Sequence, residues 1–304
     1  MVGRFATILS LGCYAILFAA TVLGVWLGLL VVPFPWPVTL ALVLPPFAFS
    51  VLHACRSIGP RRGLWLMLLT LVASLLAESV GVLTATVFGP YEYTSVLGPC
   101  FLGLVPYSVP MVWFILVYPA YVMAEWFVPA GWAGPQRWLA VASLSATMVT
   151  AVDIALDPVM VEAGAWVWRV NGSFFGIPIR NYVGWWLTVF VILSMYSRLC
   201  VLPRVWRPLR SACLARLAIF SYSVFSFATI GVALHMRLPG PALAGMLTTG
   251  IWVAAGLRST RSAPTHTPQP LLVIQERATD HSAKNPLRFL SIRDNMAVFP
   301  GITL

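Results

Sequence analysis

Long apolar runs with few polar interruptions recur along the chain. Eight of them contain about 17 residues or more, which is enough for an α-helix to cross a hydrocarbon core about 30 Å thick. They lack the strict alternation of barrel strands, so they favour helices. The predicted spans are residues 5–32, 38–54, 63–88, 104–128, 138–156, 183–202, 212–236 and 241–257. Pro45 and Pro46 interrupt the short second run, which leaves a seven-span bundle as the alternative.

Composition and charge support a membrane protein. Hydrophobic residues make up 60% of the chain and charged residues 9%, against about 25% charged in a soluble domain. The sequence therefore predicts an all-α, polytopic integral membrane bundle. With eight spans, arginines at 56, 61, 62, 137, 204, 207 and 210 share one side with both chain ends. The positive-inside rule makes that side cytoplasmic in a prokaryotic cell membrane.

The charge and the remaining motifs exclude several kinds of partner. The net charge of +10 follows the membrane topology, so we predict no nucleic-acid partner. The five cysteines form no CxxC pair and the four histidines are scattered, so we expect neither a metal nor a redox cofactor. Residues 1–258 are predicted to form a transmembrane catalytic domain. Residues 259–304 are polar and read as a mostly disordered cytoplasmic tail.

Carboxylates gather in the half of the bundle opposite the arginines. Before the tail the acids are Glu78, Glu92, Glu125, Asp153, Asp157 and Glu162. Glu78 and Asp153 each lie about 15 residues, or roughly 23 Å, from the cytoplasmic ends of their helices. Intramembrane carboxylates usually serve a function. Glu92 and Glu162 read as solvated loop charges, and Glu125 is expected to reach the cytoplasmic interface.

The stretch DIALDPVM places Asp153 and Asp157 four residues apart, on one helical face. Two nearby carboxylates away from water cannot both ionise cheaply, so one should keep its proton. Such a proton suits the protonation of an unreactive hydrophobic substrate. Asp157 precedes Pro158 at the predicted helix end, where the alternative is a simple turn residue.

Two loops are predicted to close over these acids from the outer side. They are residues 88–99 and 157–182, and the second is too long and too apolar for an ordinary connection. Its aromatic side chains alternate with arginine and asparagine. Aromatic residues also favour membrane interfaces, but the whole cluster fits a partly re-entrant lid over a cavity.

These segments resemble a known family. FGPYEYTSVLGP, VPYSVPMVWF and DIALDPVMVEAGAWVWRVNGSFFGIPIRNYVGWW are similar to the membrane carotenoid biosynthesis proteins of the CruF type, over a region from about Glu78 to Trp186. Members of that family are carotenoid 1,2-hydratases of bacteria and haloarchaea. The resemblance implies cofactor-independent addition of water to the terminal C1=C2 double bond of an acyclic (ψ) carotenoid end, with the carotenoid held in the bilayer.

The site residues follow from combining the resemblance with the acid pattern. Either Asp153 or Asp157 protonates C2, and Glu78 or the second aspartate takes the proton of the incoming water. The expected substrate-binding residues are Tyr91, Tyr93, Trp166, Trp168, Asn171, Arg180, Asn181 and Trp185. Arg180 is alternatively a counter-ion for an aspartate. The resemblance also allows association with other carotenoid biosynthesis enzymes.

Three other functions stay open at this point. The DxxxD spacing is typical of intramembrane prenyltransferases that hold Mg²⁺ and a diphosphate, although a second acidic motif is absent. A carotenoid end-group cyclase or isomerase would use the same acid and lose a proton in place of adding water. A non-catalytic carotenoid-binding protein is the third alternative. The sequence leaves the particular carotenoid, the number of ends hydrated and the oligomeric state undetermined.

Overall fold

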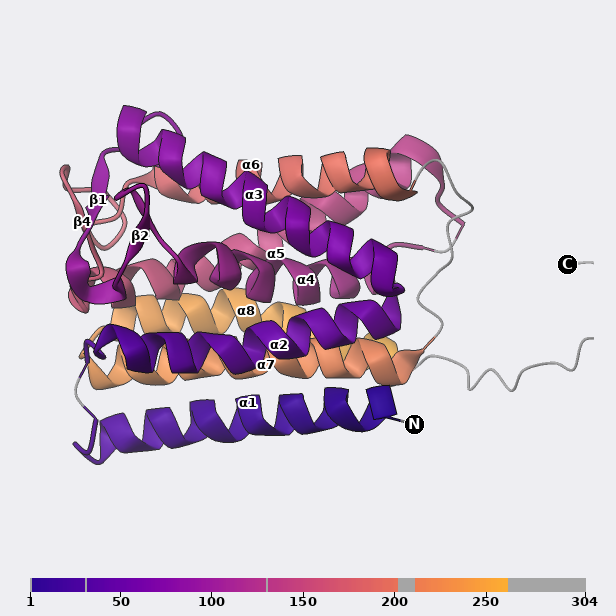
Figure 1. Ribbon diagram of the computed structural model, residues 1–304, viewed down its shortest axis with the longest axis horizontal. Coiled ribbons are helices and arrows are strands. Elements are labelled where there is room, and N and C mark those ends of the chain that lie inside the picture. Colours follow the sequence, from indigo (N-terminus) through magenta and orange to yellow (C-terminus); the bar gives the residue numbers. More distant parts are fainter. Residues whose placement is uncertain (1, 31, 130, 202–210, 262–304) are drawn as a thin grey trace, which may run out of the picture. The chain divides into compact units, whose positions relative to one another are not determined.

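The computed structural model describes residues 2–30, 32–129, 131–201 and 211–261. This part of the chain contains eight helices that are long and apolar enough to cross a membrane (Figure 1). The helices are α1 Val2–Trp26, α2 Trp36–Ser57, α3 Pro60–Thr84, α4 Ser108–Phe127, α5 Gly134–Glu162, α6 Ile179–Tyr196, α7 Ala212–His235 and α8 Pro239–Arg261. The predicted all-α polytopic membrane fold is confirmed, and the seven-span alternative is wrong.

Two helices run through prolines at which the sequence suggested a break. Pro45 and Pro46 both lie inside α2. Pro158 lies inside α5, which ends six residues beyond the predicted limit at Leu156. Packing against neighbouring helices compensates for the lost backbone hydrogen bond in such positions. Asp157 is therefore a helical residue, and its interpretation as a turn residue is wrong.

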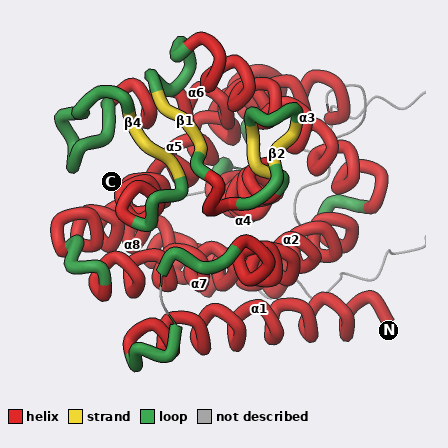
Figure 2. The backbone as a smooth tube through the Cα atoms, turned by 60° about the vertical axis from the view of Figure 1, so that its left-hand side comes forward, coloured by secondary structure: helices red, strands yellow, loops and turns green. Residues whose placement is uncertain are grey.

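The two long loops at the acidic end of the bundle contain short strands that the sequence analysis did not predict. β1 (Tyr91–Tyr93) pairs antiparallel with β4 (Trp166–Trp168), with Tyr91 opposite Trp168 and Tyr93 opposite Trp166. β2 (Cys100–Phe101) pairs with β3 (Val105–Pro106). Figure 2 shows both pairs at one end of the bundle. The predicted irregular lid is thus a regular β-ribbon in the part that carries the tryptophans.

A close approach between α6 and the segment before β1 holds this ribbon in place. Gly184 of α6 lies so near the segment that a Cβ atom there would be 2.5 Å from the Val87 carbonyl oxygen and 2.7 Å from the Phe88 ring. Only glycine permits such a contact without displacement of the backbone. The Phe88 side chain is in turn buried, which fixes the start of β1 against the bundle.

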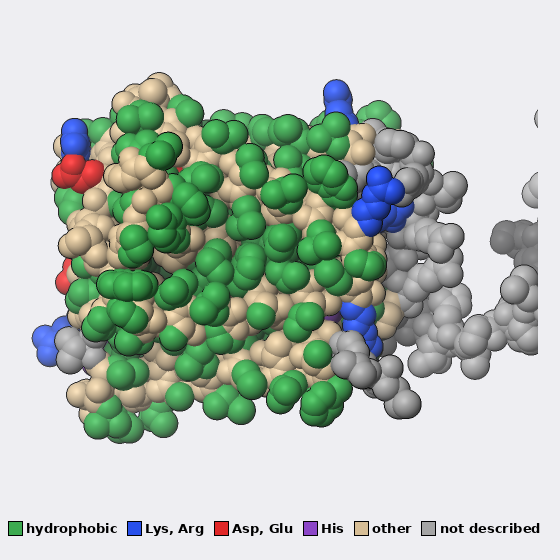
Figure 3. All heavy atoms as spheres, in the orientation of Figure 1, with side chains coloured by type: hydrophobic (Ala, Val, Ile, Leu, Met, Phe, Trp, Pro, Cys, Tyr) green, Lys and Arg blue, Asp and Glu red, His purple; other side chains and the backbone are tan. Residues whose placement is uncertain are grey.

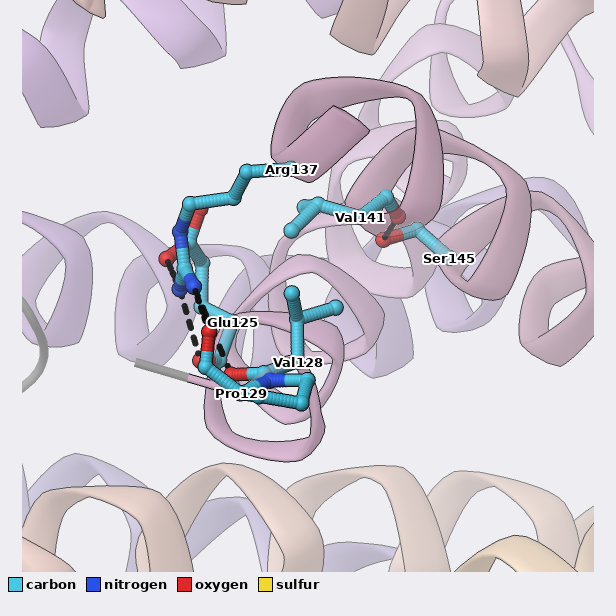
Figure 4. Close-up of polar contacts among 6 residues, drawn as sticks. All are labelled: Glu125, Val128, Pro129, Arg137, Val141 and Ser145. Atoms are coloured by element: carbon cyan, nitrogen blue, oxygen red, sulfur yellow. Dashed lines mark hydrogen bonds and ion pairs between the residues drawn. The ribbon is translucent and has the colours of Figure 1, made fainter. Parts of the chain in front are cut away.

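The opposite end of the bundle is held by a buried ion pair (Figure 4). Arg137 of α5 contacts the Glu125 carboxylate at 2.7 Å, and both side chains are less than 10% exposed. The same guanidinium donates to the carbonyl oxygens of Glu125, Val128 and Pro129, which lie at the C-terminal end of α4. A cation at that end also complements the helix dipole. Glu125 therefore lies in the last turn of α4 with its carboxylate paired to Arg137, and its position at the cytoplasmic interface stays a prediction.

The outer surface of the bundle matches a membrane environment. Figure 3 shows hydrophobic side chains covering the middle of the visible face, with charged side chains near its two ends. Among the helices, α4 has the largest buried share and α1 the smallest. α8 continues to Arg261, three residues into the predicted tail. The remainder of that predicted tail, residues 262–304, lies outside the described residues.

Candidate active site

Glu78 lies at the centre of one half of the candidate site. Its Oε2 atom accepts hydrogen bonds from the Tyr91 hydroxyl and, at 2.8 Å, from the Tyr93 hydroxyl. Its Oε1 atom accepts from the Trp113 indole N–H at 2.9 Å. The residue is only 4% exposed. These three hydrogen-bond donors stabilise the ionised form of the buried Glu78 carboxylate.

Asp157 lies at the centre of the other half. Its Oδ1 atom accepts from the indole N–H groups of Trp166 at 2.7 Å and Trp168 at 3.3 Å. Its Oδ2 atom accepts from the Asn181 side-chain amide at 2.5 Å. The β-ribbon thus connects the two halves, because β1 supplies two of the three donors to Glu78 and β4 supplies two of the three donors to Asp157.

Asp153 lies behind Asp157 and does not line the cavity. It is fully buried, and its Oδ2 atom accepts from Asn181 at 2.9 Å. Its Oδ1 atom has no hydrogen-bond partner among the described residues. The Asn181 amide therefore bridges the two aspartates. If Asp153 is protonated, its Oδ1 atom can carry the proton, because that oxygen accepts no hydrogen bond among the described residues. Of the predicted acid pair, only Asp157 faces the space where a substrate can lie.

Aromatic rings surround the two carboxylates. The Tyr91 and Trp168 ring centroids are 5.2 Å apart, and those of Tyr93 and Trp166 are 5.9 Å apart. Trp113 stacks on Trp185 at 4.1 Å with an interplanar angle of 22°. Aromatic faces attract a nearby cation by about 0.5–2 kcal/mol each. The walls of the site are thus suited to a short-lived positive charge.

Burial, followed by the negative charge of Glu78, raises the pKa of both Tyr91 and Tyr93 above the ordinary phenol value of 10.0. Both hydroxyls consequently remain protonated at neutral pH. They therefore act as donors to the Glu78 carboxylate.

One cavity of about 240 Å³ joins these groups to an apolar region of the bundle. We call its acidic part the polar end; it is lined by Glu78, Tyr91, Tyr93, Trp113, Asp157, Trp166, Trp168, Asn181 and Trp185. We call a second part the apolar arm; it is lined by Phe18, Thr21, Val22, residues 32–34, Thr39, Leu42, Val43, Pro46, Phe225, Ala228, Thr229 and Val232. The arm therefore belongs to α1, α2, α7 and the segment between α1 and α2. Residues of α4, of α5 and of the loops that follow α3 and α5 complete the lining of the cavity.

Two predicted binding residues lie away from the cavity. Asn171 and Arg180 are both exposed and do not line it. Asn171 lies in the segment between β4 and α6, and Arg180 lies in the first turn of α6. The apolar sequence pattern did not indicate the course of this part of the chain. Glu92 forms an exposed ion pair with Arg169 at 2.6 Å on the outer side of the ribbon. Glu162 is exposed at the end of α5.

Trp113 is a site residue that the sequence reading missed. It lies within an apolar run and so resembles any other core residue. One feature of the sequence could have identified it. Trp113 lies within two turns of the N-terminal end of α4, and Glu78 lies within two turns of the C-terminal end of α3, so the two residues lie at a similar depth. In the part of the chain that the structure describes, no group of three or more histidine, cysteine or acidic side chains is arranged to hold a metal ion.

Comparisons with known proteins agree on one family. A family model described as carotenoid biosynthesis protein matches residues 37–252. A bisanhydrobacterioruberin hydratase of Haloarcula japonica is 37% identical over 137 residues. That match covers 45% of this chain and 45% of the relative, so the chain aligns with less than half of that protein's length. No solved structure matches.

Proposed function

Because the chain belongs to the carotenoid biosynthesis protein family, we propose that it is a carotenoid hydratase. It adds water across the terminal C1=C2 double bond of an acyclic carotenoid end and yields a tertiary alcohol. The relative named as a hydratase supports this reaction class. The observation that carries the proposal is the polar end itself: two buried carboxylates, each with three hydrogen-bond donors, face one aromatic cavity.

The first step is protonation of the alkene. Asp157 donates its proton to C2, the π electrons form the new C–H bond, and a tertiary cation remains at C1. Asp157 has this role because it lines the cavity, whereas Asp153 is a positioning residue that holds Asn181 in place beside Asp157. A general acid contributes about 10²–10⁴-fold to a rate.

The second step is capture of the cation by water. The stacked Trp113 and Trp185 and the negative charge of Glu78 stabilise the cation. The oxygen of the water forms the C1–O bond, and its proton passes to Glu78. Transfer of that proton to solvent and uptake of another by the aspartate pair restore the enzyme, so the net reaction is the addition of one water.

A carotenoid cyclase or isomerase is the second candidate, since the same acid and cation serve it. The amide of Asn181 favours hydration, because it gives the cavity a polar group beside Asp157 that can hold a water molecule. A prenyltransferase has less support. The cavity lining contains no lysine or arginine among the described residues, and a diphosphate needs such cations.

The test is a mass-resolved pigment profile from a host that makes lycopene and γ-carotene. We expect the wild-type protein to produce a more polar pigment that is heavier by one water. Asp157→Asn should abolish that product. Glu162→Gln, on the exposed end of the same helix, should leave it unchanged and serves as the matched control. An isomeric product of unchanged mass would establish the cyclase or isomerase.

A further inference from the structure

The apolar arm has the properties of a binding site for a long hydrocarbon chain. It contains no charged side chain among the described residues that line it. Its threonine hydroxyls donate to backbone carbonyl oxygens: Thr21 to Leu17, Thr39 to Phe34 and Thr229 to Phe225. These threonines therefore present their methyl groups. A ligand in the arm needs no polar group.

The cavity is too small for a whole carotenoid. Its volume is about 240 Å³, below the roughly 300–1,000 Å³ of a pocket for a drug-sized ligand. A forty-carbon chain with its end at Asp157 must continue beyond the arm. The arm extends toward α1, which lies at the edge of the bundle and packs mainly on α2 and α7 (Figure 1).

Val22 forms the wall between the arm and the outside of the bundle. Its side chain lines the cavity, and its Cγ1 atom lies 3.0 Å from the position that a Cβ atom on Gly231 of α7 would take. One turn further along α1, the exposed Trp26 donates from its indole N–H to the Gly231 carbonyl at 3.1 Å. Further along the same two helices, the Tyr14 hydroxyl donates to the Ser221 carbonyl and Phe18 packs on Phe225. Near Val22 and Gly231 the boundary has the hydrogen bond of Trp26 and the contact of Trp26 with His235.

We propose that the apolar arm binds the polyene next to the reacting end group, and that the chain passes into the bilayer between α1 and α7 at Val22 and Gly231. The proposal rests on the proposed function for the identity of the ligand. It implies that the protein holds one end of its substrate at a time, while the far end stays in the lipid and is not selected.

The test links α1 to α7 by a reversible disulfide. In a background in which the five cysteines are replaced, Val22→Cys and Gly231→Cys are combined and oxidised. Ile219→Cys with Gly256→Cys is the matched control, because a Cβ atom on Gly256 would also lie 3.0 Å from the partner isoleucine and this pair of α7 and α8 does not line the cavity. Uptake of lycopene is followed by quenching of tryptophan fluorescence, separately from product mass.

We expect oxidation of the first pair to slow uptake at least tenfold and reduction to restore it, with no change in the control pair. Unchanged uptake in the oxidised first pair would overturn the proposal. Normal uptake without a water adduct in the wild type would leave the passage intact and refute the hydratase function instead.

A second variant avoids dependence on Gly231. Ala228→Trp places a large ring in the arm and should lower lycopene uptake and hydration at least tenfold. Leu234→Trp makes a similar ring on an exposed position of the same helix and should have no effect. Equal uptake by the two variants would show that the polyene does not lie in the arm.

Discussion

The two aspartates of the DIALDPVM motif have different environments, and the structure ranks them in a way that their spacing does not. Asp157 lines the cavity and Asp153 contacts it only through Asn181. We expect Asp157→Asn to lower the hydration rate by about 10²–10⁴-fold, the range of a general acid. Asp153→Asn should lower it less and alter its pH dependence, because a second titratable carboxyl group near Asp157 is then lost.

Initial rates at several pH values, measured with both single variants, check this ranking. Glu162→Gln controls for loss of a carboxylate in the same helix. A larger loss in Asp153→Asn than in Asp157→Asn would reverse the assignment of donor and positioning residue.

The hydrogen bond from the Trp113 indole N–H to Glu78 allows a second test of the site. Trp113→Phe keeps an aromatic ring beside Trp185 and removes the N–H group that donates to Glu78. Hydrogen bonds to charged groups contribute about 1.5–3 kcal/mol, so we expect the variant to lose roughly tenfold to a hundredfold in hydration rate.

The matched control is Trp186→Phe. Trp186 also stacks on an aromatic ring and donates to a side chain, Thr147, but on an exposed face of α6. Its rate should stay close to that of the wild type. Equal losses in the two variants would indicate a general effect of tryptophan removal on the helices.

At the scale of elements, the sequence predicts the helices well and the ribbon poorly. Long apolar runs specify membrane helices because the bilayer demands satisfied backbone groups, and all eight were found. β1 and β4 are three residues each, too short for a periodic pattern. They pair across more than 70 residues, so no local signal identifies them.

The same distinction between local patterns and contacts distant in sequence explains which site residues the sequence could identify. Glu78, Asp153 and Asp157 were identifiable because a carboxylate in an apolar run is unusual. Tyr91, Tyr93, Trp166 and Trp168 came from their composition and the resemblance. Their division between the two carboxylates depends on strand register, and register depends on contacts distant in sequence.

The contact between α6 and the segment before β1 should tolerate little added volume. Gly184→Ala would place a methyl group against the Val87 carbonyl, and such overpacking costs about 1–3 kcal/mol. We expect a lower unfolding temperature in detergent and a displaced β1. Gly250→Ala, where no atom lies within 4 Å of the new Cβ, is the control and should be neutral or slightly stabilising. Equal stability of the two variants would contradict the close contact.

At the scale of the whole molecule, the arginine distribution predicts which side of the membrane the active site faces. The polar end lies toward the C-terminal ends of α3 and α5, and the opposite ends of these two helices carry Arg61, Arg62 and Arg137. The positive-inside rule then places the site in the half of the bundle away from the cytoplasm. Water for the reaction would enter from that side.

Labelling of single cysteines in intact cells tests this orientation without altering any charge. Ser173 lies between β4 and α6, Gln136 lies in the first turn of α5, and both are exposed. Because α5 crosses from the arginine-rich side to the side of the ribbon, the two positions should lie on opposite faces of the membrane. In a background without the native cysteines, Ser173→Cys should react with a membrane-impermeant maleimide in intact cells. Gln136→Cys should react only after permeabilisation. The reverse pattern would place the carboxylates and their water supply in the cytoplasmic half, and equal labelling of both positions would contradict the single crossing by α5.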